Sequence, residues 1–201
     1  AAAGDTVTGT MVKQKIRVGI FGGSGYGGSE LMRILLQHPD VSINLVPANE
    51  QAGKAVGEVH RNLNGLTDLH FSAPPDGLEN LEIDCAFLAL PHGQAMEVAP
   101  KVPANVKVID LSGDFRLRDQ DEFEAHYGRS HTAMDAQSEF VYGLTETNRE
   151  TIAKARMIAN PGCFATATLL GLAPLVAKDL ITGRVVVDAK TGSSGSGAKA
   201  A

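Results

Sequence analysis

The feature that most constrains the fold is a glycine-rich turn, Gly22–Gly28, in which five of the seven residues are glycine. The residues before it, Ile16–Phe21, alternate and then run apolar, as a buried strand does. The residues after it, Ser29–Gln37, place apolar side chains at helical spacing, and Pro39 ends that helix because proline disfavours helical geometry at the preceding residue. With a second apolar strand at Ser42–Val46, the chain opens as the strand–turn–helix–strand unit of a doubly wound parallel sheet.

Three of these glycines, Gly22, Gly25 and Gly28, have the spacing GxxGxxG. Such a turn lets the backbone approach a phosphate closely, and it directs the amides of a helix N-terminus at negative charge. The order of strand, turn, helix and strand predicts dinucleotide binding, while a tight turn without a ligand is the alternative. A nucleoside-triphosphate loop is excluded, because it needs a lysine where this chain has Gly27-Gly28-Ser29.

Strands and helices continue to alternate along the rest of the chain. Four more strands are predicted from short apolar runs, at Asp84–Leu90, Val106–Leu111, Arg156–Ala159 and Arg184–Ala189. Three more helices are predicted at Gln94–Ala99, Asp119–Tyr127 and about Cys163–Ala177, and a Gly/Ser loop at Thr191–Gly197. This alternation is typical of the α/β class.

Composition and charge exclude several classes of protein. A net charge of −5 without a basic block argues against nucleic acid or anionic lipid as the main partner. No run approaches the roughly 18 apolar residues that a membrane-spanning helix needs. Two cysteines are too few for a disulfide scaffold and indicate a reducing compartment, the cytoplasm. The small polar residues at the start, 1–14, are expected to be an unstructured leader or a cloning remnant.

Cys163 is the strongest candidate nucleophile, because it follows a Pro161-Gly162 turn at the start of a predicted helix. Helix N-termini lower the pKa of a thiol and favour the thiolate, while a buried structural cysteine is the alternative. Beside a dinucleotide fold, a thiolate can attack an acyl carbon and a hydride can reduce the resulting thioester. Cys85 lies inside a predicted strand and is interpreted as a core residue.

Other chemistries have weaker support. The six histidines show no paired spacing for a metal, so no metal site is predicted, and no GxSxG motif indicates a serine hydrolase. His92, which follows a strand end at Pro91, lies either near a cofactor or in a local hydrogen bond. The residues after the second strand, Pro47–Glu50, leave the choice between NAD and NADP open, and Glu50 leans towards NAD.

Five motifs occur in order along the chain: Gly22–Leu31, Ala89–Gly93, Asp110–Leu117, Tyr142–Glu146 and Pro161–Ala167. Together they resemble the N-acetyl-gamma-glutamyl-phosphate reductase family of the semialdehyde dehydrogenase superfamily. The resemblance covers essentially Lys15 to Lys199, and five motifs in sequence are far more specific than any one of them.

The resemblance implies an arginine-biosynthesis enzyme that uses NADPH to convert an acyl phosphate to a semialdehyde, with Cys163 as the nucleophile. It implies a small-molecule substrate and a homo-oligomer. The cofactor contacts that it implies are Gly22, Ser24, Gly25, Tyr26, Gly27, Gly28, Pro91, His92, Ser112 and Gly113. The substrate contacts that it implies are Arg116, Ser193, Ser194 and Gly195, for which a structural salt bridge and a mobile loop are the alternatives.

Two departures from the family pattern keep other functions open. Lysine-pathway relatives, which reduce a carrier-bound aminoadipyl phosphate, often have Ser-Arg-Arg where this chain has Ala48-Asn49-Glu50. The family's general-base histidine lies in a His-Arg-His motif downstream, whereas no histidine follows Cys163 here. A lysine-pathway reductase and a dinucleotide-binding fragment without chemistry therefore stay as alternatives.

The fold expected from these observations is a Rossmann-type doubly wound parallel sheet followed by the start of an α+β catalytic domain. We expect a dinucleotide-binding domain at 15–155 and the beginning of the catalytic domain at 156–201. The chain length of 201 residues is expected to be that of a truncated piece, since the last residues form an unpaired Gly/Ser loop.

Overall fold

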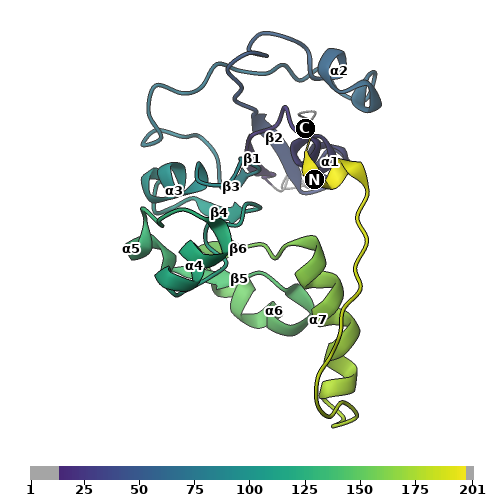
Figure 1. The fold of residues 1–201 in the computed structure, drawn as a ribbon. Helices are drawn as coiled ribbons and strands as arrows, with labels where there is room; N and C mark the ends of the chain where they lie inside the picture. Colours follow the sequence, from purple (N-terminus) through teal and green to yellow (C-terminus); the bar gives the residue numbers. More distant parts are fainter. Residues whose placement is uncertain (1–13, 198–201) are drawn as a thin grey trace, which may run out of the picture.

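Six parallel strands form one sheet, in the order β2-β1-β3-β4-β6-β5 (Figure 1). The computed structural model describes residues 14–197. The strands are β1 (Ile16–Phe21), β2 (Val41–Leu45), β3 (Cys85–Leu88), β4 (Lys107–Asp110), β5 (Phe140–Tyr142) and β6 (Met157–Ala159). The predicted α/β class and the Rossmann-type parallel sheet are confirmed.

Helices lie on both faces of this sheet (Figure 1). The α-helices are α1 (Tyr26–Leu35), α2 (Val56–Val59), α3 (Ala95–Val98), α4 (Gln120–Tyr127), α5 (Met134–Gln137), α6 (Thr145–Lys154) and α7 (Cys163–Val176). Single 3₁₀ turns are η1 (Arg61–Leu63), η2 (Ala99–Lys101) and η3 (Ser193–Ser196). No helix in the described part of the chain is long and apolar enough to span a membrane.

Alternating side chains of the central strands separate the core into two clusters. Val18 and Ile20 of β1 pack with Met32 of α1 on one face. Ala86 and Leu88 of β3 belong to the other cluster, which contains the buried side chains of α3 and α4. Successive residues of a strand point to opposite faces, and burial on both faces requires the near-continuous apolar runs seen in the sequence.

The strand order reverses next to β1, and this reversal places the candidate cofactor site. From β1 the chain crosses to β2 on one side, and β3 then pairs with the other side of β1. Ligands of open parallel sheets bind at such a switch point, outside the carboxyl ends of the strands. The Gly22–Gly28 turn after β1 and the residues after β3 meet at this point.

Most predicted elements form close to their expected bounds. The first helix begins three residues earlier than predicted, at Tyr26 rather than Ser29. Asp119 accepts a hydrogen bond from the Glu122 amide at 2.9 Å and so caps α4, as its place at the start of the predicted helix suggests. The predicted helix from Cys163 is α7, which ends one residue short of Ala177.

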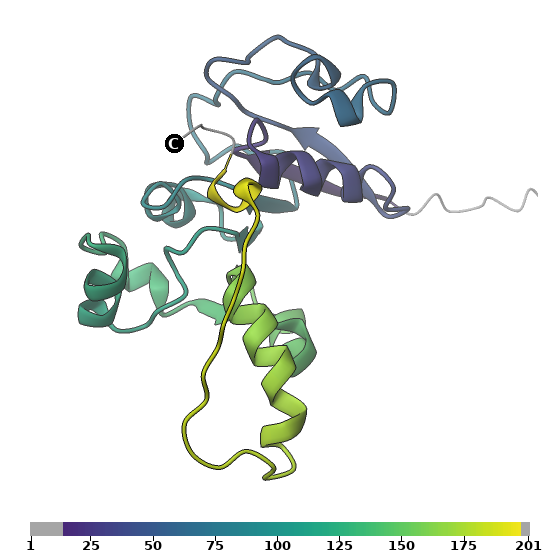
Figure 2. The same ribbon diagram turned by 45° about the vertical axis from the view of Figure 1, so that its right-hand side comes forward.

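The strand predicted at Arg184–Ala189 is wrong. These residues are extended but make no strand pairing in the described structure, and the Val186 side chain is 84% exposed. The segment instead runs back beside α7 towards α1 (Figures 1 and 2). The segment therefore does not join the sheet, whose edge strands are β2 and β5.

The elements that the sequence analysis did not predict include β5 and α6. The three residues of β5 are too few to show an alternating pattern. Helix α6 has no buried residue, so its sequence contains no apolar stripe. Helix α6 also makes the crossover that lets β5 lie parallel to β6.

The sheet extends past the domain boundary that the sequence analysis placed after residue 155. Strand β6 pairs with both β4 and β5, so Met157–Ala159 belongs to the same sheet as the glycine turn. The leader expected at 1–14 lies, apart from Gln14, outside the described residues.

Candidate functional site

The glycine turn is in direct backbone contact with the chain that leaves β3. Gly22 has φ +84°, and a Cβ there would collide with the carbonyl group of Ala89. A Cβ on Gly28 would lie 2.5 Å from Gly23 Cα and 2.7 Å from the Gly22 oxygen, so α1 packs tightly against the turn. Gly27, by contrast, has no heavy atom within 4 Å of its Cβ position and faces open space.

The N-terminus of α1 is open to an anion. Its N-cap residue is Gly25, and no side chain caps the helix in the described structure. The first amides of a helix have no intrahelical partner, and the helix dipole adds partial positive charge there. The turn therefore fits a phosphate group held by backbone amides.

Two residues far along the chain support this turn, and the sequence analysis did not single them out. Nε2 of the buried His60 lies 2.8 Å from the carbonyl oxygen of Gly23, and the His60 ring packs edge-on against Phe71. Asn62 and Ser29 exchange hydrogen bonds at 3.3 Å. No local pattern signals these contacts, because they join positions 33 and 37 residues apart.

A cleft with a volume of about 750 Å³ lies at the switch point. The glycine turn, the residues after β3, the residues after β4 and the η3 turn together form its walls. The lining residues are Gly22, Ser24, Gly25, Tyr26, Gly27, Gln51, Ala89, Leu90, Pro91, His92, Leu111, Ser112, Ser194, Gly195 and Gly197. Eight of the ten residues proposed for the cofactor are among them, and they come from three separate loops.

The other two proposed cofactor residues lie behind the walls of the cleft. Gly28 is buried under the turn. Gly113 is also buried, and its amide donates a hydrogen bond to Nδ1 of His92 at 2.8 Å. Neither residue forms part of the cleft surface; Gly28 supports the glycine turn and Gly113 supports the His92 ring.

The η3 turn places two of the proposed substrate residues beside the glycine turn. Ser194 and Gly195 line the cleft, together with the residues at the start of α1. Figure 2 shows how the chain returns from the end of α7 to α1 and so brings η3 there. Ser193 is the first residue of the same turn.

A buried carboxyl group supports the loop after β4. Asp110 is fully buried, and it accepts hydrogen bonds from the amide and the hydroxyl of Ser112 at 2.9 and 2.8 Å. Burial raises the pKa of Asp110 to about 6, although the two bonds from Ser112 act in the opposite direction. Ser112, which lines the cleft, is thereby held to the end of the strand.

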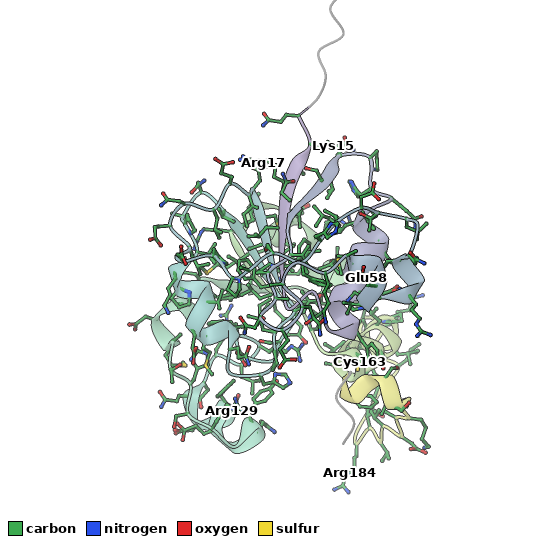
Figure 3. The ribbon with its side chains drawn as sticks, turned by 90° about the horizontal axis from the view of Figure 1, so that it is seen from above. Lys15, Arg17, Glu58, Arg129, Cys163 and Arg184 are labelled. Atoms are coloured by element: carbon green, nitrogen blue, oxygen red, sulfur yellow. The ribbon has the colours of Figure 1, made fainter. Side chains whose placement is uncertain are left out.

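Cys163 is the first residue of α7 and is exposed to solvent (Figure 3). It lines a second hollow, of about 560 Å³, formed where the starts of α6 and α7 meet. The other lining residues are Gly143, Leu144, Thr145, Glu146, Asn160, Pro161, Thr166 and Ala167. The Tyr142–Glu146 and Pro161–Ala167 motifs therefore meet around Cys163.

Cys85 has the opposite environment. It lies in β3 with 9% of its surface exposed, and burial raises the pKa of its thiol to about 11. Its interpretation as a core residue is confirmed. Only Cys163, of the two cysteines, is placed to react with a molecule from solution.

Arg116 connects the cleft to the hollow. Its Nη2 donates to the carbonyl oxygen of Leu111 at 2.9 Å, and its Nε donates to that of Asn160 at 2.8 Å. Leu111 lines the cleft and Asn160 lines the hollow. Arg116 lines neither, so two of its donor groups serve to hold the loop after β4 against the turn that leads to Cys163.

No group of three or more His, Cys, Asp or Glu side chains within residues 14–197 is arranged to hold a metal ion.

Comparisons with known proteins match both parts of the chain. Residues 17–155 match the family model "Semialdehyde dehydrogenase, NAD binding domain", and residues 163–201 match "Semialdehyde dehydrogenase, dimerisation domain". An N-acetyl-gamma-glutamyl-phosphate reductase of Acinetobacter baumannii (strain ACICU) is 50% identical over 190 residues, which cover 92% of this chain and 54% of the relative. One from Nitrosococcus oceani is 47% identical over 188 residues, with coverages of 92% and 55%. The chain thus spans about half the length of these relatives.

Solved structures agree with the fold. A structure of aspartate semialdehyde dehydrogenase with NADP from Candida albicans has a TM-score of 0.55 at 17% identity, and the match covers 84% of this chain and 48% of that one. Aspartate semialdehyde dehydrogenase from Francisella tularensis has a TM-score of 0.53 at 16% identity, with coverages of 82% and 41%. At this identity the likeness is one of fold.

The two adjacent glycines of α1 should respond in opposite ways to the same added methyl group. Gly28→Ala should lower the free energy of unfolding by about 1–3 kcal/mol, because the Cβ has no room beside Gly23. Gly27→Ala is the matched control and should raise it by up to about 1 kcal/mol, because alanine favours a helix and the position is open. Urea unfolding measures both. Equal effects would contradict the packing of α1 on the turn.

The two cysteines should differ in their reaction with iodoacetamide. At pH 8 the native chain should be alkylated at Cys163 and spared at Cys85, because Cys85 is buried and a thiol pKa of about 11 leaves little thiolate below that pH. Raising the pH towards 11 should increase the thiolate fraction of Cys85, although burial still limits access. Peptide mass spectrometry gives the site of labelling, and the urea-unfolded chain, in which both react, is the control. Labelling of native Cys85 at pH 8 would contradict its placement in the core.

Proposed function

Because the chain belongs to the semialdehyde dehydrogenase family, we propose that it carries the cofactor site and the nucleophile of an NADPH-dependent N-acetyl-gamma-glutamyl-phosphate reductase of arginine biosynthesis. The observation that supports this most directly is the position of Cys163, an exposed thiol at the start of α7 whose hollow is joined through Arg116 to the cleft at the glycine turn. Relatives of that name are about half identical to this chain.

The proposed reaction begins at the sulfur of Cys163. The thiolate attacks the acyl carbon of the acyl phosphate, an S–C bond forms, the C–O bond to phosphate breaks, and inorganic phosphate leaves with the electron pair of that bond. Bound NADPH supplies the hydride that reduces the thioester carbon to the aldehyde level. Cys163 then leaves that carbon as the thiolate when the carbonyl of the semialdehyde forms. The proposal assigns no general base to the residues of this chain.

The hollow around Cys163 fits a small acyl phosphate. The amides at the start of α7 lie next to the sulfur and have no side-chain cap in the described structure, so they are available to a carbonyl oxygen on which negative charge develops. Glu146 adds a carboxylate and Thr145 and Thr166 add hydroxyl groups to the lining. We assign substrate contact to the amides and the two threonine hydroxyls beside Cys163. Arg116, which was predicted to contact the substrate, orients their wall from outside the hollow instead.

The cleft at the switch point fits a dinucleotide. Its glycine turn offers uncapped amides to the pyrophosphate, and its far wall carries Pro91, His92 and Ser112 for the nicotinamide half. NADP rather than NAD is proposed from the resemblance to the NADPH-dependent reductase family, and the residue after β2 that lines the cleft is the neutral Gln51. Glu50, whose carboxylate would repel a 2′-phosphate, is not among the lining residues.

The proposed enzyme acts as a homo-oligomer in the cytoplasm. Its α7 exposes large apolar side chains, including Phe164, Leu169 and Val176, and it begins the segment that matches a dimerisation domain. Exposed apolar surface of this kind is typical of an interface. Both cysteines are free in the described structure, as expected for a reducing compartment.

The nucleophile can be tested in the protein at its natural length. Cys163→Ser and Cys163→Ala should reduce turnover with N-acetyl-gamma-glutamyl phosphate by at least about 10³-fold, because no thioester can form. The NADPH affinity should change less than about twofold, because Cys163 does not line the cofactor cleft. Cys85→Ala is the matched control and should keep its activity.

Further measurements decide between the alternative functions. Without NADPH, the unsubstituted enzyme should release a burst of up to one phosphate per Cys163, and the Cys163 variants should release none. Turnover that survives in Cys163→Ala would overturn the mechanism. Faster reduction of an aminoadipyl phosphate in a parallel assay would favour the lysine-pathway reaction. A natural protein of only 201 residues that binds NADPH and reduces neither substrate would favour a binding module.

The cofactor choice can be tested on the 201-residue chain by fluorescence titration. NADPH should bind at least about tenfold more tightly than NADH, the equivalent of about 1.4 kcal/mol. Glu50→Gln should change the NADPH affinity less than about twofold, because Glu50 does not line the cleft. Tighter binding of NADH, weakened by Glu50→Gln, would instead show that Glu50 contacts the ribose hydroxyls.

A further inference from the structure

The loops that follow β3 and β4 form the far wall of the cleft, and one buried carboxylate joins them. Asp114 is fully buried. Its oxygens accept hydrogen bonds from the amides of Gly93 at 2.8 and 2.9 Å, of Ala95 at 3.1 Å and of Met96 at 3.3 Å. These amides belong to the loop that carries His92 and to the first turn of α3 after it, so the position of that loop is set from a residue of the neighbouring loop.

Asp114 is itself held by its backbone. Its amide donates to Oγ of Ser112 at 3.1 Å, and the Ser112 hydroxyl donates in turn to Asp110. Its carbonyl oxygen lies 2.8 Å from Nε2 of the buried His131, whose ring packs edge-on against Phe115. The Asp114 backbone is therefore held in the core, and this fixes the position of its carboxylate independently of the loop after β3.

The contacts of the His92 ring determine which of its nitrogens carries the hydrogen. Nδ1 of His92 lies 2.8 Å from the amide nitrogen of Gly113, and an amide N–H can only donate. Nδ1 therefore acts as the acceptor and has no hydrogen. A Nδ1–H bond to the Asp114 carboxylate is the competing arrangement, but the separation of 3.9 Å is too long for a hydrogen bond.

The ring and the backbone of His92 are also fixed from the side of α4. The ring packs against Tyr127, with 5.5 Å between the centroids. The carbonyl oxygen of His92 accepts a hydrogen bond from Nη1 of Arg129 at 2.7 Å, and Figure 3 shows Arg129 on the side of the molecule away from Cys163. A rotation of the ring would break the Gly113 bond and the Tyr127 contact together.

Nε2 lies at the opposite edge of the ring from this anchored Nδ1. The His92 side chain is 53% exposed and lines the cleft, and Nε2 makes no hydrogen bond with any residue that the structure describes. A neutral imidazole whose Nδ1 is an acceptor carries its hydrogen on Nε2. The Nε2–H group can thus donate a hydrogen bond to a molecule in the cleft, while Nδ1 accepts one from the Gly113 amide.

We propose that Asp114 is a positioning residue that, together with the Gly113 amide, holds His92 in the Nε2–H tautomer as a fixed hydrogen-bond donor to an acceptor oxygen on the nicotinamide half of the dinucleotide. This inference rests on the proposed cofactor site. It separates the roles of neighbouring motif residues: His92 touches the ligand, and Gly113 and Asp114 act through His92.

The tautomer can be read without any ligand. In the ¹⁵N-labelled 201-residue chain at pH 7.5, two-bond ¹H–¹⁵N correlations should show His92 with a protonated Nε2 and an unprotonated Nδ1. Asp114→Asn keeps the size of the side chain but places an amide group against the donors of Gly93 and Ala95. The His92 signals should then show a mixture of tautomers, while the signals of His38, an exposed histidine remote from the cleft, stay unchanged.

The donor role is tested by NADPH titration of matched variants. His92→Phe should weaken NADPH binding about tenfold, the loss of about one hydrogen bond, and His92→Gln, which carries an amide donor near the position of Nε2, should restore part of that loss. His126→Phe, the same change at an exposed position of α4, should bind as the unsubstituted chain does. Asp114→Asn should weaken binding in proportion to the fraction of His92 in the other tautomer.

The outcomes separate this inference from the cofactor assignment. If the unsubstituted chain bound NADPH but His92 showed a protonated Nδ1, or if His92→Phe bound NADPH normally, the donor role would be overturned and the cofactor site would stand. If the unsubstituted chain bound no dinucleotide, the cofactor site would fail and the donor role with it. Because His92→Phe leaves the hydrogen bonds from the Gly93, Ala95 and Met96 amides to Asp114 in place, its result can be interpreted even if Asp114→Asn does not fold.

Discussion

The contact between Gly22 and the chain that leaves β3 is the one on which the rest of the structure depends. At this point the strand order reverses, and no side chain fits between the two backbones. The same constraint holds Gly28 against Gly23, which brings the uncapped start of α1 to the carboxyl edge of the sheet. Because these glycines have no side chains, the backbone segments pack closely together, and the start of α1 borders the cleft directly.

The rest of the site is built by hydrogen bonds between loops of different strands. Asp114 and His92 join the loop after β3 to the loop after β4. Arg116 continues this chain of contacts from Leu111 to Asn160, the residue before the Pro161-Gly162 turn that leads into Cys163. The cleft at the glycine turn and the hollow around Cys163 are therefore connected through a few polar residues.

The sequence showed that these polar residues belong to a motif, but it did not show which groups each of them contacts. Within the Asp110–Leu117 motif, Ser112 and Gly113 were predicted to contact the cofactor and Arg116 the substrate. The structure shows that the charged groups of this motif chiefly hold backbone. His60 could not be recognised at all, because its contact with Gly23 spans 37 residues. The strand predicted at Arg184–Ala189 failed for a related reason: apolar residues with strand propensity form a strand only where a partner edge is available.

The sequence by itself determined the parallel sheet, the glycine turn between its first strand and first helix, and the cysteine at a helix start. Each of these depends on short-range patterns: apolar periodicity, glycine spacing and a turn before a helix. Only the tertiary structure decided which residues face the cleft, which lie behind it, and where η3 and Arg116 act. Those positions depend on contacts between segments far apart in the chain, and a hydrogen bond to a distant backbone group leaves no periodic trace in the sequence.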